Sequence, residues 1–214
     1  MSPLVARVCT PEDPLRVGVL VSGSGSNLQA LLDRQAGSHH RVVVVVSNVA
    51  GAFALERAQK AGIAAVVEPH TGLGRAEHEA RVQAHLEQHG VELLVLGGYM
   101  RLLSPWLVSR WARRIVNVHP ALLPSFPGMH AAKQALDHGC RVAGCTVHLV
   151  DEGTDTGPIL LQAAVDIDDD DDEAALHRRI QAQEHRLLPL AVEAYATGQV
   201  VDVDGRVRCL AAKR

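Results

Sequence analysis

Short apolar runs alternate with amphipathic segments over about 120 positions of the chain. The runs have the length of buried parallel strands, and the segments between them have helical spacing. The expected strands are Val17–Ser22, Arg41–Val46, Ile63–Val67, Glu92–Leu96 and Arg114–His119, and the expected helices are Asn27–Asp33, Phe53–Ala61 and Arg75–His89. This alternation predicts an α/β fold, namely a Rossmann-like, doubly wound and mostly parallel sheet with helices on both faces.

The pattern changes in the later part of the chain. Val142–Asp151 and Ile159–Asp166 are typical of strands joined by a loop, and Glu173–Tyr195 is typical of a long amphipathic helix. Asp204 and Gly205 lie between alternating residues, which predicts a short C-terminal hairpin. The fold is therefore expected to end in a long helix and a hairpin.

No linker or internal repeat divides the sequence, so we expect a single domain over residues 1–214. Residues 1–14 are polar and contain three prolines, which predicts a flexible leader. Residues 199–214 are expected to form the hairpin and tail. A mass of 22.9 kDa suits one domain with a core of its own.

Composition excludes several classes of protein. Aromatic residues make up only 3% of the chain, so alanine and valine must fill the core. The net charge is −3, without the cationic excess of a nucleic-acid binder. The longest apolar run, Val42–Val46, is too short to span a membrane. We expect small-molecule partners, with neither nucleic acid nor membrane.

Four cysteines, with no C-x-x-C spacing, give no sign of a disulfide framework or a zinc site. The chain also opens without the apolar segment of a secretory signal. These features predict a cytoplasmic protein with reduced thiols and no metal.

A glycine-rich turn follows the first expected strand and opens a helix in the run Ser22–Leu28. Such a turn lets a ligand approach the backbone, and the helix N-terminus points N–H groups at an anion. A dinucleotide fingerprint would need glycine at Leu28 and an acid after the second strand, where Ser47 and Asn48 stand. The turn thus favours a terminal phosphate on a smaller ligand, with a purely structural turn as the alternative.

Asn117 and His119 occupy alternate positions of one expected strand and so share a face. An amide donor beside an imidazole suits oxyanion stabilisation and proton transfer. A structural histidine beside a turn-forming asparagine is the alternative. Asp155, in a later glycine-flanked loop, would favour an imidazolium if it approached His119, but spacing alone does not single it out among neighbouring acids.

Several motifs together resemble one known family. They are VSGSGSNLQ from Val21, GYMRLLSP from Gly98, NVHPALLPSFPG from Asn117, DTGPIL from Asp155 and QEH from Gln183. In order and spacing, over roughly positions 16–200, the chain resembles the phosphoribosylglycinamide formyltransferases. These are the folate-dependent glycinamide ribonucleotide transformylases of the formyltransferase superfamily.

The resemblance implies an activity and a set of site residues. The family transfers the formyl group of 10-formyltetrahydrofolate to the amine of N1-(5-phosphoribosyl)glycinamide in purine biosynthesis, without a metal, and we expect a monomer or a homodimer. The resemblance implies catalytic roles for Asn117, His119 and Asp155. It implies ribonucleotide binding by Gly25, Ser26, Asn27, Leu28, Gln29 and Glu184. It implies folate binding by Arg75, Met100, Arg101, Leu102, Leu103, Asn117, Asp151, Glu152, Gly153, Thr154 and Asp155.

Alternative functions remain at this point. A 10-formyltetrahydrofolate hydrolase or another formyltransferase, such as one acting on methionyl-tRNA, would share the fold. Those relatives carry an additional N-terminal or C-terminal domain, for which we expect no room in this chain. A noncatalytic nucleotide-binding regulator is the alternative from another class, although it would have no need of the Asn117, His119 and Asp155 trio.

Overall fold

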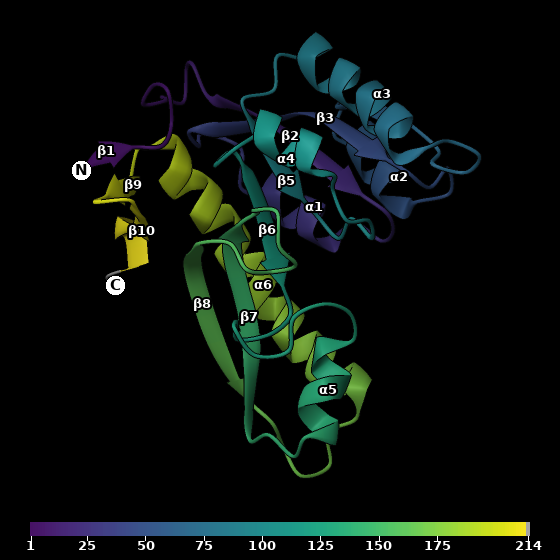
Figure 1. The fold of residues 1–214 in the computed structure, drawn as a ribbon, viewed down its shortest axis with the longest axis vertical. Helices are drawn as coiled ribbons and strands as arrows, with labels where there is room; N and C mark the ends of the chain where they lie inside the picture. Colours follow the sequence, from purple (N-terminus) through teal and green to yellow (C-terminus); the bar gives the residue numbers. More distant parts are fainter. Residues whose placement is uncertain (213–214) are drawn as a thin grey trace.

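The computed structural model describes residues 1–212, and a seven-stranded sheet forms its centre (Figure 1). The strand order is β4-β3-β2-β5-β6-β7-β8. The first five strands of that order run parallel, whereas β6 pairs with β7, and β7 with β8, in antiparallel fashion. The strands are β2 (Leu15–Val21), β3 (His40–Ser47), β4 (Ala64–Val67), β5 (Leu93–Leu96), β6 (Ile115–His119), β7 (Val142–Leu149) and β8 (Ile159–Asp166).

Helices cover both faces of the sheet, as the sequence predicts. One apolar core cluster takes residues from α1, α2, α5 and α6, and a second takes residues from α3 and α4. Successive residues of β2 supply the two sides, with Val19 in the first cluster and Leu20 in the second. The helices are α1 (Ser26–Leu32), α2 (Phe53–Lys60), α3 (Arg75–Gln88), α4 (Pro105–Arg110), α5 (Ala131–Asp137) and α6 (Glu173–Ala196).

Two helices were not predicted from the pattern of apolar residues. α4 begins at a recognisable signal, because Ser104 accepts a hydrogen bond from Leu107 N and Pro105 occupies the first turn. α5 has a weaker signal, since its N-cap His130 lies in the left-handed region with no side-chain cap. Both helices are short, so few turns of periodicity mark them.

The chain ends form a small sheet in the order β1-β9-β10, with β1 at Ser2–Pro3, β9 at Val200–Val203 and β10 at Arg206–Cys209, followed by the 3₁₀ turn η1 at Leu210–Ala212. The predicted hairpin is confirmed. Asp204 and Gly205 both have positive φ, as a tight two-residue turn between strands requires. Positions 213 and 214 of the predicted tail lie outside the described residues.

The leader is packed against the body of the protein, which corrects the prediction that residues 1–14 are loose. β1 pairs with β9, and Leu4 N donates to Val200 O at 2.9 Å. Val5 and Cys9 are buried in the first core cluster. The prolines suggested a polar tail, but these two apolar side chains find burial against the C-terminal part of the fold.

The carboxyl ends of β2, β5 and β6 meet at one edge of the sheet. β2 lies between β3 and β5 in the sheet. After β2 the chain adds β3 and β4 on one side of it and then crosses to add β5 on the other side. Ligands bind α/β sheets at such a switch point, outside the carboxyl ends of the strands. β6 and the loops after β2, β5 and β7 carry the candidate site.

Candidate active site

Asn117 and His119 lie on β6 and point to the same side, as strand alternation predicts. Val116 and Val118 of the same strand belong to the apolar core. The side chain of His119 is only 6% exposed, so its environment is set by the protein. The two polar groups are therefore held at the carboxyl end of a rigid strand.

Asp155 reaches this pair from the loop after β7. Its Oδ2 lies 3.3 Å from His119 Nδ1 and accepts a hydrogen bond from Gly128 N at 2.8 Å. Its Oδ1 accepts a hydrogen bond from Asn117 Nδ2 at 3.4 Å. Asp155 has a φ of 55°, a left-handed conformation that turns its carboxylate into the site. The structure thus brings together the three side chains that the resemblance singled out.

The contacts of His119 and Asp155 set the electrostatics of the trio. Nε2 of His119 lies 2.8 Å from Phe126 O, so both ring nitrogens face oxygen atoms. Burial alone would raise the pKa of Asp155. The close approach of His148, the hydrogen bond from Gly128 N and the charges of His119 and His148 outweigh burial and hold that pKa below 3.8.

His148 is a member of the cluster that sequence reasoning missed. β7 runs antiparallel to β6 and places His148 directly opposite Asn117. Its Nε2 lies 3.2 Å from Asn117 Nδ2 and 3.6 Å from Asp155 Oδ1, while Nδ1 faces Leu149 O at 2.9 Å. Thr146 and His148 occupy alternate positions of an apolar strand, as Asn117 and His119 do in β6. This alternation in the sequence could have indicated that His148 belongs to the site.

A cavity of about 600 Å³ opens beside the trio. Arg75 reaches it from α3, Met100 to Leu103 from the loop after β5, and Asp151 to Asp155 from the loop after β7. Every residue predicted to bind folate therefore lines one cavity. Burial raises the pKa of a further lining residue, Tyr99, to about 12. The lining residues not predicted from the sequence include Tyr99, Val108, Met129, His130, His148 and His177.

The glycine-rich turn requires glycine at position 25. Gly25 has a φ of 69° and caps α1, and a Cβ on it would lie 2.6 Å from Ala54 Cβ. Arg57 braces the same turn by donating to Ser24 O at 2.8 Å and to the Gln29 side chain at 2.9 Å. The backbone of this turn is held open toward solvent by packing against α2.

Asn27 and Glu184 meet where α1 contacts α6. Asn27 Nδ2 donates to Glu184 Oε2 at 3.0 Å, and both side chains are buried. Burial raises the pKa of Glu184, although the hydrogen bond from Asn27 and the charge of His177 act in the opposite direction. Leu28 is fully buried in the core, so its side chain does not face a ligand.

Within residues 1–212, no cluster of three or more histidine, cysteine, aspartate or glutamate side chains has the arrangement of a metal site. No helix in the same part of the chain is long and apolar enough to cross a membrane.

The fold and the cleft define a Rossmann-like α/β protein that gathers an amide, an imidazole and a carboxylate at the carboxyl edge of its sheet. The chain belongs to the formyl transferase family, which matches residues 15–192. A phosphoribosylglycinamide formyltransferase of Mycobacterium tuberculosis is 44% identical over 209 residues, covering 95% of this chain and 94% of that protein. The solved glycinamide ribonucleotide transformylase 1 of Symbiobacterium toebii superposes with a TM-score of 0.88 at 47% identity, covering 92% of this chain and 94% of that one.

Longer proteins also contain a similar region. The trifunctional purine biosynthetic protein adenosine-3 of Drosophila pseudoobscura pseudoobscura is 48% identical over 188 residues, which are 86% of this chain. The chain spans only 14% of that protein's length. A formyltetrahydrofolate deformylase from Pseudomonas syringae shares the fold with a TM-score of 0.85, at 26% identity over 92% of this chain and 66% of that one.

Proposed function

We propose that this protein transfers the formyl group of 10-formyltetrahydrofolate to the amine of N1-(5-phosphoribosyl)glycinamide in purine biosynthesis. The products are the N-formyl ribonucleotide and tetrahydrofolate. The observation that carries the proposal is the single cluster of Asn117, His119 and Asp155 beside the cavity. The names of relatives that match nearly the whole chain support the same reaction.

Asn117 and His119 would stabilise the charge that develops on the formyl oxygen when the amine attacks. The contacts of Asn117 Nδ2, at 3.2 and 3.4 Å, are long and can be exchanged for a stronger bond to an oxyanion. His119 adds positive charge in a site that excludes most water, where such charge is most effective. Asp155 holds the ring charged and in one orientation.

The protons balance without a net gain or loss. The substrate amine loses one proton as the new C–N bond forms, and the folate nitrogen gains one as its bond to the formyl carbon breaks. Asp155 is held as a carboxylate by its low pKa, so it acts as a fixed counter-charge to His119. Water at the mouth of the cleft would carry the proton between the two nitrogens.

The 600 Å³ cavity fits a folate, since pockets for ligands of that size span about 300–1,000 Å³. Met100 and Leu102 are 70% and 62% exposed although they are apolar, which marks a surface kept for an apolar ligand. The folate supplies the activated formyl group. Arg75 offers a cation to its carboxylates, and the loop 151–155 offers backbone and side-chain polar groups.

The ribonucleotide would bind on the other side of the trio. Its phosphate would meet the N–H groups of Ser26, Asn27 and Leu28 at the start of α1, on the cradle that Gly25 shapes. Glu184 would accept hydrogen bonds from the sugar. Gln29 has its side chain bound to Arg57 and Asp33, so we assign it the bracing of this cradle.

An assay of tetrahydrofolate release with and without the ribonucleotide tests the proposal. We expect release only when the acceptor is present, together with formation of the N-formyl product. Release without acceptor would instead indicate a hydrolase, and binding without turnover would indicate a regulator. A cytoplasmic location and a monomer or homodimer stay predictions, checked by fractionation and analytical ultracentrifugation.

A further inference from the structure

Ser22 connects the two loops that flank the cleft. It follows β2 directly and precedes the glycine-rich turn. Its hydroxyl accepts a hydrogen bond from Met100 N at 2.9 Å, and its own N–H donates to Gly98 O at 3.1 Å. A single residue thus ties the start of the turn to the segment that carries Met100 and Leu102.

Asn48 fixes the direction of this contact. Ser22 Oγ donates to Asn48 Oδ1 at 2.6 Å, which commits the hydroxyl proton and leaves an oxygen lone pair for Met100 N. Asn48 is 6% exposed, and its Nδ2 lies 3.1 Å from His70 Nδ1. The chain of donors and acceptors therefore runs across the loops after β5, β2, β3 and β4, and each group orients the next.

In the first half of the loop that follows β5, Gly97 N donates to Leu20 O at 2.9 Å and Tyr99 packs against the second core cluster. Met100 and Leu102 are largely exposed, and Gly98 has a φ of 80°. Its far end is fixed separately, because Ser104 N donates to the buried carboxylate of Glu79 at 2.7 Å. Between these points, the bond to the Ser22 hydroxyl holds the backbone at Met100, which lines the cleft.

We propose that Ser22, Asn48 and His70 are positioning residues that set the folate loop 97–103 at a fixed distance from the ribonucleotide's phosphate turn. This inference rests on the proposed function and deepens it. None of the three residues needs to touch the reacting atoms. Transfer between two bound substrates depends on their relative placement, and small misplacements slow such reactions strongly. Ser22 links the two loops directly, because it begins the glycine-rich turn and bonds to Met100 N.

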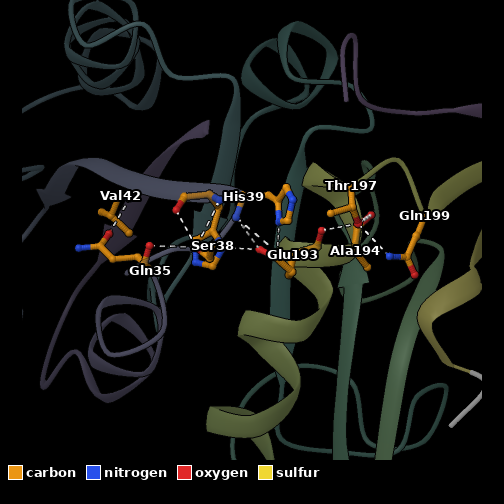
Figure 2. A network of polar contacts seen from close by, with 9 residues as sticks. Gln35, Ser38, His39, Val42, Glu193, Ala194, Thr197 and Gln199 are labelled. Atoms are coloured by element: carbon orange, nitrogen blue, oxygen red, sulfur yellow. Dashed lines mark hydrogen bonds and ion pairs between the residues drawn. The ribbon is translucent and has the colours of Figure 1, made fainter. Parts of the chain in front are cut away.

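Ser22→Ala and Asn48→Ala test this inference, each with a matched control. Ser22→Thr keeps the hydroxyl. Ser38→Ala removes another half-buried serine hydroxyl that also makes several hydrogen bonds, at the opposite end of β3 (Figure 2). Steady-state kinetics would give KM for each substrate, and calorimetry with tetrahydrofolate alone would give folate affinity.

Loss of one such hydrogen bond weakens folate binding by roughly five- to tenfold. We expect that rise in folate KM and in the tetrahydrofolate Kd for Ser22→Ala and Asn48→Ala, with ribonucleotide KM within about twofold of wild type. Ser22→Thr and Ser38→Ala should behave as wild type. Because both alanine variants break the same series of hydrogen bonds, the double variant should bind folate only slightly more weakly than either single variant.

Unchanged folate affinity in Ser22→Ala would overturn the inference. An equal loss of affinity for both substrates that follows a loss of thermal stability would also overturn it. The same loss of folate affinity in Ser38→Ala would do so as well. Failure of the proposed function is a separate result. Wild-type protein would then not formylate the ribonucleotide, whereas the tetrahydrofolate titration would still report whether Ser22 holds the loop.

Discussion

His119 Nδ1 lies 3.3 Å from Asp155 Oδ2, although His119 ends β6 and Asp155 lies in the loop that follows β7. The contact exists because the loop after β7 folds back toward β6: β7 itself ends with Leu149 opposite Val116, and the loop then brings Asp155 to Asn117 and His119. The carboxylate is also held by Gly128 N, so its position does not depend on the histidine alone. Asp155 therefore presents a fixed carboxylate of low pKa to the ring.

Asp155→Asn should lower kcat by about 10²–10³-fold, because a neutral amide does not stabilise the charged His119 ring that supports the oxyanion. The amide is nearly isosteric, so the fold should be retained. Stopped-time assays of product at saturating substrates would measure the loss. Circular dichroism and thermal melting are the controls, and wild-type turnover in this variant would remove Asp155 from the mechanism.

The same substitution should change the acid stability of the protein. The pKa of Asp155 is depressed in the folded state, so its carboxylate contributes stability above its ordinary value of 3.8. That contribution is lost as the pH falls through the lower folded pKa. Melting temperatures recorded at decreasing pH should therefore drop less in Asp155→Asn than in the wild type over this acid range. Parallel curves for the two proteins would contradict the assigned shift.

Asn117→Ala and His119→Ala should each reduce turnover by about 10²–10³-fold while both substrates still bind. Each substitution removes one of the two groups placed to stabilise the formyl oxygen. Calorimetry with each ligand separates binding from chemistry. Full activity in His119→Ala would defeat the assignment of the ring as the electrostatic group.

Much of the fold follows from local pattern alone. Continuous apolar runs such as that at Val17 can be satisfied only as buried strands, and their predicted ends lie within two residues of the observed ones. The shared face of Asn117 and His119 follows from strand geometry in the same way. The short elements α5 and β1 were not predicted, because they depend on packing partners elsewhere in the chain rather than on their own periodicity.

The local sequence pattern could not predict that Asp155 completes the trio. Asp155 meets His119 only because of the pairing register between β6 and β7, which no local spacing encodes. His148 was missed for the same reason, since its neighbour Asn117 lies on another strand. Family resemblance selected Asp155, whereas the burial and the hydrogen bonds that set its pKa became visible only in the structure.

Gly25→Val should raise the KM for the ribonucleotide and leave folate affinity unchanged. A side chain at a φ of 69° costs about 1–2 kcal/mol, and its Cβ would collide with Ala54, so the turn must shift. Gly51→Ala is a matched control, because Gly51 has ordinary φ and no atom within 4 Å of an added Cβ. Impaired folate binding alone would show that this turn is not the phosphate cradle.

Glu184→Gln should weaken binding of the ribonucleotide by roughly tenfold or more without destabilising the protein. The amide still accepts the hydrogen bond from Asn27 and no longer leaves a charge in a buried place. Because burial raises the pKa of Glu184, its protonation stabilises the folded wild type below the ordinary value of 4.5, and this stability is lost as pH rises through the folded pKa. The variant should therefore melt at an equal or higher temperature at neutral pH. A marked loss of stability there would contradict the assigned shift.

Glu193→Gln should destabilise the protein by about 1–3 kcal/mol and leave turnover at 25 °C unchanged. Glu193, near the end of α6, binds His39 Nδ1 at 2.5 Å and the Nδ1 atom of the buried His40 at 3.1 Å, at the opposite end of β3 from the cleft (Figure 2). Burial would raise the pKa of Glu193, but the hydrogen bonds from His39 and His40 hold it low. Its carboxylate thus contributes stability above its ordinary value of 4.5, which is lost as pH falls through the folded pKa. Denaturant titrations should show a difference in the free energy of unfolding between variant and wild type at neutral pH that disappears in acid. A difference that stays constant with pH would mean that charge at this position does not hold α6 against β3.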